Sequence, residues 1–301
     1  MSTIPANDSP TLSLRGVAKR YDDFDLGPID LDLEPGMVLA FVGPNGAGKT
    51  TTLHCAMGLV RPDRGEVKIC GRVNDPHRPD LKHDVGFVCE VQGHYQSWSV
   101  AQNLSFVESF YRDFDRSRAE ALAKRFGLKM GKRVGALSRG GKAKLALVTA
   151  LSHSPRLLLL DEPTAGLDPV VRAEVLDVLW EILEDGDKSI LYSTHVLSDI
   201  SRLADEIVFL REGQLVRRDS KDALTDRWRR LSFRFSGDLP PLGSERRHRR
   251  AGDEHQLVTP DGESSLAMLR ELGAERIQEA RMTIDEIAVE ILREGHHVAS
   301  D

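Results

Sequence analysis

The sequence has few cysteines, no long apolar run and no excess of positive charge, and each shortage excludes a class of protein. Its three cysteines, Cys55, Cys70 and Cys89, show no C-x-x-C spacing, so we expect buried free thiols and neither a disulfide framework nor a zinc site. The most apolar run, residues 157–160, ends at two carboxylates. A helix needs about 18 or more apolar residues to span a bilayer, so we expect no transmembrane helix.

The charge balance and the composition favour a globular chain in the cytosol. The formal net charge is −6, which argues against bulk electrostatic binding to nucleic acid. The N-terminus shows no basic segment followed by an apolar one, so we expect no secretory signal. With 301 residues and 40% hydrophobic content, the chain can bury one large core and a small appended domain.

The sequence does contain a complete phosphate-binding loop. Residues 43–50 read GPNGAGKT, which matches G-x-x-x-x-G-K-[ST] between an apolar segment of strand composition, residues 37–42, and a segment of helical composition, residues 51–59. The residues expected to bind the nucleotide are Gly43, Pro44, Asn45, Gly46, Ala47, Gly48, Lys49, Thr50 and Thr51. Lys49 is expected to reach the β- and γ-phosphates and Thr50 to ligate Mg²⁺.

A second apolar strand, residues 156–160, leads into the carboxylates Asp161 and Glu162. An uninterrupted apolar run of this kind is typical of a buried parallel strand, and ligands in open α/β sheets bind at the carboxyl ends of such strands. We therefore expect Asp161 to hold the Mg²⁺ shell beside the phosphate loop, and Glu162 to polarise the water that attacks the γ-phosphate. The alternative is an ordinary acidic pair that caps a helix.

Three further motifs follow the family order of ATP-binding subunits of ABC transporters, and residues 12–220 resemble that family. Residues 137–141 (LSRGG) resemble its LSGGQ signature, residues 165–168 (AGLD) its D-loop, and residues 193–195 (STH) the segment with its switch histidine. The resemblance implies an α/β phosphate-loop ABC ATPase fold with a helical subdomain. It also implies an enzyme that hydrolyses ATP, with Mg²⁺ bound, to drive transport across a membrane.

The same resemblance assigns roles to individual residues. Tyr21 would stack on adenine, although it could instead be a strand-edge tyrosine packed on the sheet. His195 would hydrogen-bond the γ-phosphate and orient the attacking water, and Asp168 would couple two ATP sites across a dimer interface. Ser138 and Gly140 of the signature would contact ATP held by an opposite subunit. The implied partners are a second ATP-binding subunit, identical or different, and an integral-membrane permease on a separate chain.

Two positions depart from the family pattern. Glu90 stands where the family has a glutamine that touches Mg²⁺, and Gln92 two residues later is the alternative for that role. A carboxylate at this place would change the charge beside the metal. Arg139 replaces the first glycine of the signature and Gly141 its glutamine. Arg139 could neutralise a γ-phosphate, as an arginine finger does, or point to solvent.

The segment from about residue 91 to residue 150 is predicted to form the helical subdomain. The apolar spacing predicts helices over residues 101–111 and 118–126, and the signature leads into a third over residues 141–151. Residues 92–98 are polar and aromatic, which suits a groove that accepts a coupling helix of the permease. The alternative is that Tyr95 and Trp98 close the core of the subdomain.

Residues 222–301 are predicted to form a small α+β accessory domain, separate from an ATP-binding domain over residues 1–221. Strands are expected near residues 231–235, 255–259 and 275–281, and helices near residues 264–272 and from Thr283, where Thr-x-x-Glu forms a capping box. An arginine-rich stretch, residues 227–250, is interpreted as a solvated charged loop or a contact with anionic lipid. The terminal helix resembles the end segment of antibiotic-resistance-type export ATPases, which favours export.

Two other functions compete with a transporter ATPase that sits on the inner face of the membrane. A soluble ABC ATPase that acts on ribosomes or DNA usually carries tandem cassettes, a long coiled-coil insert or zinc modules, and the sequence shows none of these. A non-hydrolysing nucleotide-dependent clamp or immunity module is suggested by Glu90 and the altered signature, but Glu162 and His195 argue against it. The transported substrate is not encoded in these motifs.

Overall fold

A computed structural model describes residues 9–75, 79–89, 93–184, 186–237, 239–240 and 245–293. The body of the molecule, residues 9–220, contains a six-stranded sheet in the order β10-β9-β3-β8-β7-β6. Its strands are β3 (Val38–Val42), β6 (Val85–Val88), β7 (Leu157–Asp161), β8 (Ser189–Thr194), β9 (Glu206–Arg211) and β10 (Gln214–Ser220). All pairings are parallel except that of β10 with β9, so the carboxyl ends of β3, β7 and β8 meet at one edge.

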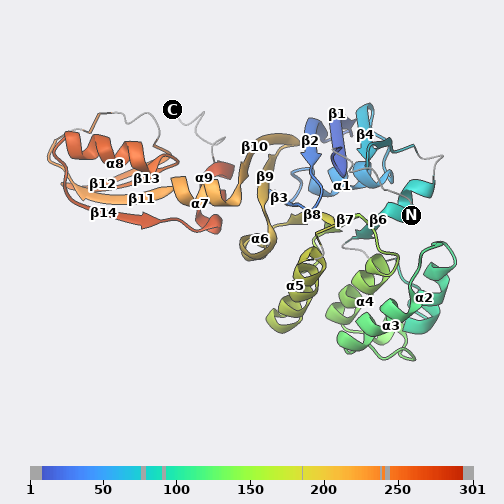
Figure 1. Cartoon of the computed structure of the whole chain (residues 1–301). Coiled ribbons are helices and arrows are strands. Elements are labelled where there is room, and N and C mark those ends of the chain that lie inside the picture. The colour runs from blue at the N-terminus through green and yellow to red at the C-terminus, as the bar shows by residue number, and fades with distance from the viewer. Residues whose placement is uncertain are drawn as a thin grey trace.

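A second, antiparallel sheet of the body has the order β2-β1-β4-β5 and lies over one face of the first (Figure 1). It consists of β1 (Leu12–Arg20), β2 (Asp25–Leu33), β4 (Arg64–Ile69) and β5 (Arg72–Val73), and α1 (Lys49–Met57) packs between the two sheets. Alternate apolar residues of β3 and β7 are buried there and the others are buried on the opposite face, as their uninterrupted hydrophobic composition predicts.

The other face of the central sheet is covered by helices that form the helical subdomain and its support. These elements are α2 (Val100–Glu108), α3 (Arg116–Arg125), η2 (Val134–Ala136), α4 (Arg139–Leu151), α5 (Pro169–Glu184) and α6 (Leu197–Leu203), whereas η1 (Pro79–Asp84) leads directly into β6. Side chains of α4 and α5 share one apolar core with β7 and β8. The expected α/β fold with a helical insert is confirmed.

The C-terminal part, residues 221–293, forms a four-stranded antiparallel sheet in the order β12-β13-β11-β14. Its elements are α7 (Lys221–Arg227), β11 (Arg229–Arg234), β12 (Arg247–Ala251), β13 (Glu254–Thr259), α8 (Gly262–Glu271), β14 (Glu275–Arg281) and α9 (Ile284–Arg293). The expectation of a loop through the arginine-rich stretch is wrong for residues 247–251, which form edge strand β12. Its backbone pairs with β13, so the arginines line a sheet edge.

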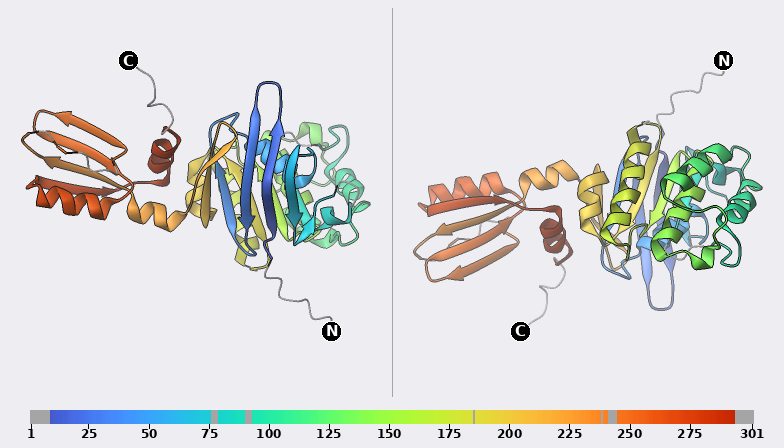
Figure 2. Two further views of the ribbon diagram at one scale, coloured as in Figure 1. Left: turned by 90° about the horizontal axis from the view of Figure 1, so that it is seen from above. Right: turned by 90° about the horizontal axis from the view of Figure 1, so that it is seen from below.

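The last helix of the C-terminal part returns to the body. Figure 2 shows α9 between the C-terminal sheet and the body, and its buried Ile287 and Ile291 share a core with Ile200 of α6 and Phe209 of β9. Glu286 accepts a hydrogen bond from Arg230 of β11 at 2.8 Å, and the expected capping box with Thr283 begins the helix. Helix α9 therefore joins the two parts of the chain.

Candidate active site

The phosphate loop joins the buried strand β3 to α1, as its sequence context predicts. Gly48 has φ 103° at the N-cap of α1, a region that favours glycine. A Cβ atom at Gly48 would lie 2.7 Å from Leu26 Cδ1 and 3.0 Å from Phe24 Cζ. Glycine is thus required here both by the backbone conformation and by the close approach of Phe24 and of Leu26 at the start of β2.

A pocket of about 420 Å³ lies over the start of α1. Its lining residues are Asp23, Phe24, Asn45, Gly46, Ala47, Gly48, Lys49, Thr50, Thr51 and Glu162. The fold therefore brings most of the predicted nucleotide ligands together with the predicted base Glu162, which lies more than a hundred residues later in the chain. Lys49 is almost fully buried, and desolvation by this burial lowers the pKa of its ammonium group.

The Lys49 ammonium lies inside the curve of the loop. It donates to the carbonyl oxygen of Gly43 at 2.8 Å and to that of Pro44 at 3.2 Å, and its Nζ is 3.9 Å from Glu162 Oε1. A positive charge surrounded by carbonyls and backbone N–H groups of one loop suits an anionic ligand with several oxygens. Lys49 thus lies between the carbonyl oxygens of the phosphate loop and the carboxylate of Glu162.

Glu162 and His195 meet across neighbouring strands. Glu162 follows β7 and His195 follows β8, and His195 Nδ1 lies 2.8 Å from Glu162 Oε2. The Glu162 side chain is 10% exposed, whereas that of His195 is 53% exposed. Glu162 also has φ 50°, an uncommon conformation for a residue other than glycine, and its N–H donates to the Ser193 carbonyl at 3.0 Å. The backbone therefore directs this carboxylate toward the pocket and the histidine.

Asp161 has the environment of a metal ligand. It is 2% exposed, and its Oδ1 is a buried oxygen with no hydrogen-bond partner among the described residues. The neighbouring Ser193 on β8 likewise has a buried hydroxyl without such a partner. Buried polar atoms are nearly always satisfied. Together with Thr50 on the pocket wall, these oxygens fit a hard divalent cation such as Mg²⁺, which takes oxygen ligands.

The loop between β1 and β2 contributes two pocket residues that the sequence analysis did not predict. Tyr21, predicted to stack on the base, is 43% exposed and stands outside the pocket lining, with Lys19 Nζ 5.9 Å from its ring centroid. Phe24 and Asp23 of the same loop line the pocket instead. The sequence held one signal for Phe24: it lies only three residues after Tyr21, so either aromatic ring could have been assigned to the base. Base stacking by Tyr21 remains a prediction.

The signature residues stand at the start of α4, apart from the phosphate loop of their own chain. Ser138 is the N-cap of α4, and its Oγ accepts from the Gly141 N–H at 3.1 Å. Neither Ser138 nor Gly140 is among the residues that line the pocket over α1. Asp168 caps α5 and accepts from the N–H groups of Val170 and Val171 at 3.1 and 3.0 Å.

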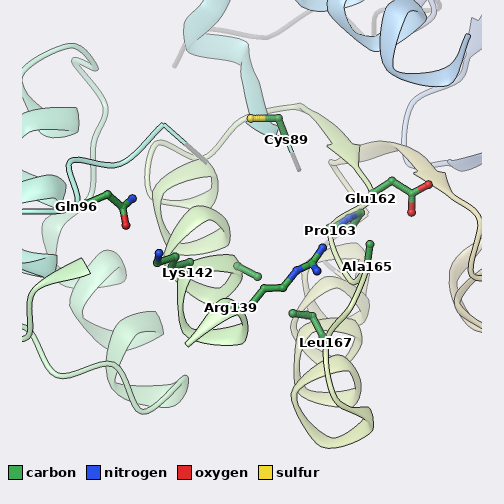
Figure 3. Close-up of a pocket in the computed structure, with 9 residues that line it drawn as sticks. Cys89, Gln96, Arg139, Lys142, Glu162, Pro163, Ala165 and Leu167 are labelled. Atoms are coloured by element: carbon green, nitrogen blue, oxygen red, sulfur yellow. The ribbon is translucent and has the colours of Figure 1, made fainter. Parts of the chain in front are cut away.

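Arg139 is an exposed residue, in line with one of the two alternatives, and its action on a γ-phosphate remains a prediction. Figure 3 shows its side chain extending from α4 toward Pro163 and Ala165, in a second pocket that Glu162 also lines. A Cβ atom at Gly166 of the D-loop would lie 2.5 Å from Arg139 Nη1. The guanidinium therefore packs on the D-loop of its own chain. Glu90 and Gln92, the alternatives for the glutamine position, lie outside the described residues.

The comparisons with known proteins agree with this geometry. Residues 26–165 match the family model described as ABC transporter. The chain is 32% identical over 211 residues to the bacitracin transport ATP-binding protein BcrA of Bacillus licheniformis, covering 69% of either chain. It is 34% identical over 222 residues to the Nod factor export ATP-binding protein I of Burkholderia orbicola (strain AU 1054), covering 71% of this chain and 72% of that protein.

A solved structure of a dimeric bacterial ABC transporter cassette superimposes with a TM-score of 0.63 at 25% identity, over 69% of this chain and 98% of that one. Within the described parts of the chain, no helix is long and apolar enough to cross a membrane. The phosphate loop, the acidic strand end, the signature and the histidine thus stand in one fold that relatives share, and the chain belongs to the ATP-binding proteins of ABC transporters.

Proposed function

We propose that this chain is the MgATP-hydrolysing subunit of an export transporter whose permease is a separate chain. The contact between His195 Nδ1 and Glu162 Oε2 carries the proposal. Glu162, a possible proton acceptor, also lies 3.9 Å from Lys49 of the phosphate loop, so the acceptor stands beside the expected phosphates. Export is supported by the relatives named for transport of bacitracin and export of Nod factor. The working position would be the cytoplasmic face of a membrane, docked on the permease.

Hydrolysis at this site would use three side chains of the chain itself. Glu162 would accept a proton from a water molecule while the water oxygen bonds to the γ-phosphorus and the bond from that phosphorus to the β-phosphate oxygen breaks. Because an ionised carboxylate can only accept, the 2.8 Å contact requires a proton on His195 Nδ1, and a hydrogen bond from His195 to the γ-phosphate would require a second proton on Nε2. Lys49 would neutralise charge on the phosphates.

Thr50 and Asp161 are the residues that would hold Mg²⁺ here. The bound cation neutralises charge on the β- and γ-phosphates. The buried Oδ1 of Asp161, which has no hydrogen-bond partner in the described part of the chain, and the hydroxyl of Thr50 at the pocket wall support this assignment. Among the competing functions, a non-hydrolysing clamp would not need the contact between Glu162 and His195, so that contact favours hydrolysis.

A second ATP-binding subunit is part of the proposal. Ser138 presents the N-terminus of the thirteen-residue helix α4, which favours an anion, away from the pocket of its own chain. A partner's γ-phosphate would meet it only across an interface. The similarity to a dimeric cassette supports this arrangement. ATP would then join two subunits and hydrolysis would release them, which is the motion that a permease converts into transport.

An aromatic surface on the helical subdomain is the proposed contact with the permease. Tyr95 stacks on Trp98 with ring centroids 4.3 Å apart, and Phe106 of α2 meets both rings edge-on. Phe110 extends the cluster and is 62% exposed. The exposure of this aromatic cluster supports the contact, because a contiguous exposed aromatic patch is typical of a protein interface.

Glu162→Gln tests the proposal, because it removes the base and keeps the size of the side chain. The variant is expected to bind MgATP, to hydrolyse it at least about a hundredfold more slowly, and to accumulate as an ATP-bound dimer. Light scattering with MgATP would show a doubling of the 33.5 kDa mass. Hydrolysis at the wild-type rate would refute the role of Glu162. A monomer that binds ATP would refute self-association and leave a different chain as the partner.

A further inference from the structure

A buried carboxylate lies just behind the active site and has no part in the chemistry described above. Asp199 of α6 is 0% exposed and follows His195 by four residues. Its Oδ1 accepts from Arg172 Nε at 2.5 Å, and its Oδ2 accepts from the Tyr192 hydroxyl at 2.9 Å. The Thr164 hydroxyl also donates to Oδ2 and lies 3.1 Å from the Tyr192 hydroxyl.

The partners of Asp199 come from the segments that carry the catalytic residues. Thr164 follows Glu162 by two residues in the loop after β7, and Tyr192 precedes His195 by three residues in β8. Arg172 lies in the first turns of α5, just after the D-loop. Asp199, which lies in α6 after the histidine, is therefore bonded to three other segments. They are the loop after β7 that carries Glu162, strand β8 before the histidine, and helix α5 after the D-loop.

Burial makes this network rigid. A carboxylate removed from water is costly unless it is paired and hydrogen-bonded. Here one oxygen accepts from the guanidinium of Arg172 and the other from two hydroxyls, so moving these segments apart would leave the buried carboxylate without its partners. The His195 side chain, in contrast, is 53% exposed. Packing around its own ring does little to fix it, so its position depends on the backbone that Asp199 anchors.

We propose that Asp199 is a positioning residue for hydrolysis, which holds α6 against the loop after β7 so that His195 Nδ1 meets Glu162 Oε2. The inference rests on the proposed roles of Glu162 and His195. Misplacement of catalytic groups by about 1 Å can cost roughly a hundredfold in rate. Loss of the anchor should therefore slow hydrolysis without weakening the binding of ATP, because the phosphate loop has no contact with this network among the described hydrogen bonds.

Asp199→Asn in the full chain tests the proposal, because it keeps the shape of the side chain and removes the charge that pairs with Arg172. We expect kcat to fall about ten- to a hundredfold, with the Kd for a non-hydrolysable ATP analogue unchanged within about twofold. Asp177→Asn is the matched control. Asp177 of α5 pairs with Arg202 of α6, so it also bridges these two helices, but both side chains are about half exposed. Its kcat should stay within about twofold of wild type.

A double-mutant cycle with His195→Ala separates positioning from general stability. If Asp199 acts through the histidine, Asp199→Asn should change the residual rate of His195→Ala by less than about twofold. The inference would be overturned if the fold-loss in kcat of the double variant equalled the product of the two single losses. It would also be overturned if Asp199→Asn and Asp177→Asn had the same kcat. Wild-type hydrolysis by His195→Ala itself would instead overturn the proposed role of the histidine.

A milder variant covers the case in which Asp199→Asn does not fold at the assay temperature. Tyr192→Phe removes one donor to Asp199 and keeps the packing of the ring, which is 2% exposed. It should lower kcat about three- to tenfold in the wild-type background and leave the residual rate of His195→Ala unchanged. An unchanged kcat in the wild-type background would count against Asp199 as a positioning residue.

Discussion

Ile287→Ala is expected to destabilise the junction between the C-terminal part and the body. Ile287 of α9 is 0% exposed and belongs to the apolar core that α9 shares with α6 and β9. Truncating a fully buried isoleucine to alanine removes its transfer free energy and leaves a cavity, at a cost of about 2 to 5 kcal/mol. A loss of this size is a large fraction of the stability of an ordinary domain.

Trp228 supplies the assay, because it is fully buried in the same core. Replacing Trp98 and Trp180 by phenylalanine would leave Trp228 as the one tryptophan, and its fluorescence during urea unfolding would then report on the junction. Val289→Ala is the matched control, since Val289 lies on the same helix but is 41% exposed, and its effect should stay within about 0.5 kcal/mol. Equal urea midpoints for Ile287→Ala and Val289→Ala would refute the conclusion that α9 shares one apolar core with α6 and β9.

The remaining predictions concern ATP and Mg²⁺. Lys49→Ala should abolish tight MgATP binding in calorimetric titrations, because it removes the buried charge inside the loop. Tyr21→Ala should weaken binding by no more than about ten- to a hundredfold, since stacking is worth roughly 1 to 3 kcal/mol per base; an unchanged Kd, with a loss for Phe24→Ala, would move the stack to Phe24. Glu90→Gln should preserve basal hydrolysis and shift its dependence on free Mg²⁺, because a hard cation responds to ligand charge. Superimposable Mg²⁺ curves would show that Glu90 is not near the metal.

The sequence predicts the parts of this site whose geometry is local. The phosphate loop, the carboxylates after β7 and the histidine after β8 each follow an apolar strand, and parallel strands bring their carboxyl ends to one edge. The contact between Glu162 and His195 follows from that rule, because the two residues end neighbouring strands. The distance of 2.8 Å between His195 Nδ1 and Glu162 Oε2 could be learned only from the structure.

The features that the sequence did not predict depend on long-range packing. Phe24 reaches the pocket because the loop between β1 and β2 folds against Gly48, a contact that no periodicity encodes. In the sequence, Asp199 is simply a polar residue in a short segment. Its burial depends on Thr164, Arg172 and Tyr192, which come from separate segments of the chain. The arginines of β12 lack the alternation of apolar and polar residues that indicates a strand, because this edge strand buries little on either face.

Arg139 shows how a departure from a family motif can be interpreted once its neighbours are known. Its guanidinium packs on Gly166, so the signature helix and the D-loop of one chain are in direct contact (Figure 3). An arginine finger is worth about a thousandfold or more in rate. Because Arg139 is engaged with its own D-loop, Arg139→Gly, which restores the family residue, should lower kcat by no more than about tenfold. A loss of about a thousandfold in radiolabelled phosphate release would show that Arg139 acts on the γ-phosphate.

Gly166→Ala provides an independent measure of the same contact. The new Cβ atom would lie 2.5 Å from Arg139 Nη1, and it would also strain a backbone that has φ 67°. The strain is present whether or not residue 139 is arginine, whereas the collision requires the guanidinium. Gly166→Ala should therefore lower the melting temperature more in the wild-type background than in Arg139→Gly. Equal decreases in the two backgrounds would show that the arginine moves aside at no cost, and that the signature helix and the D-loop are not held together by it.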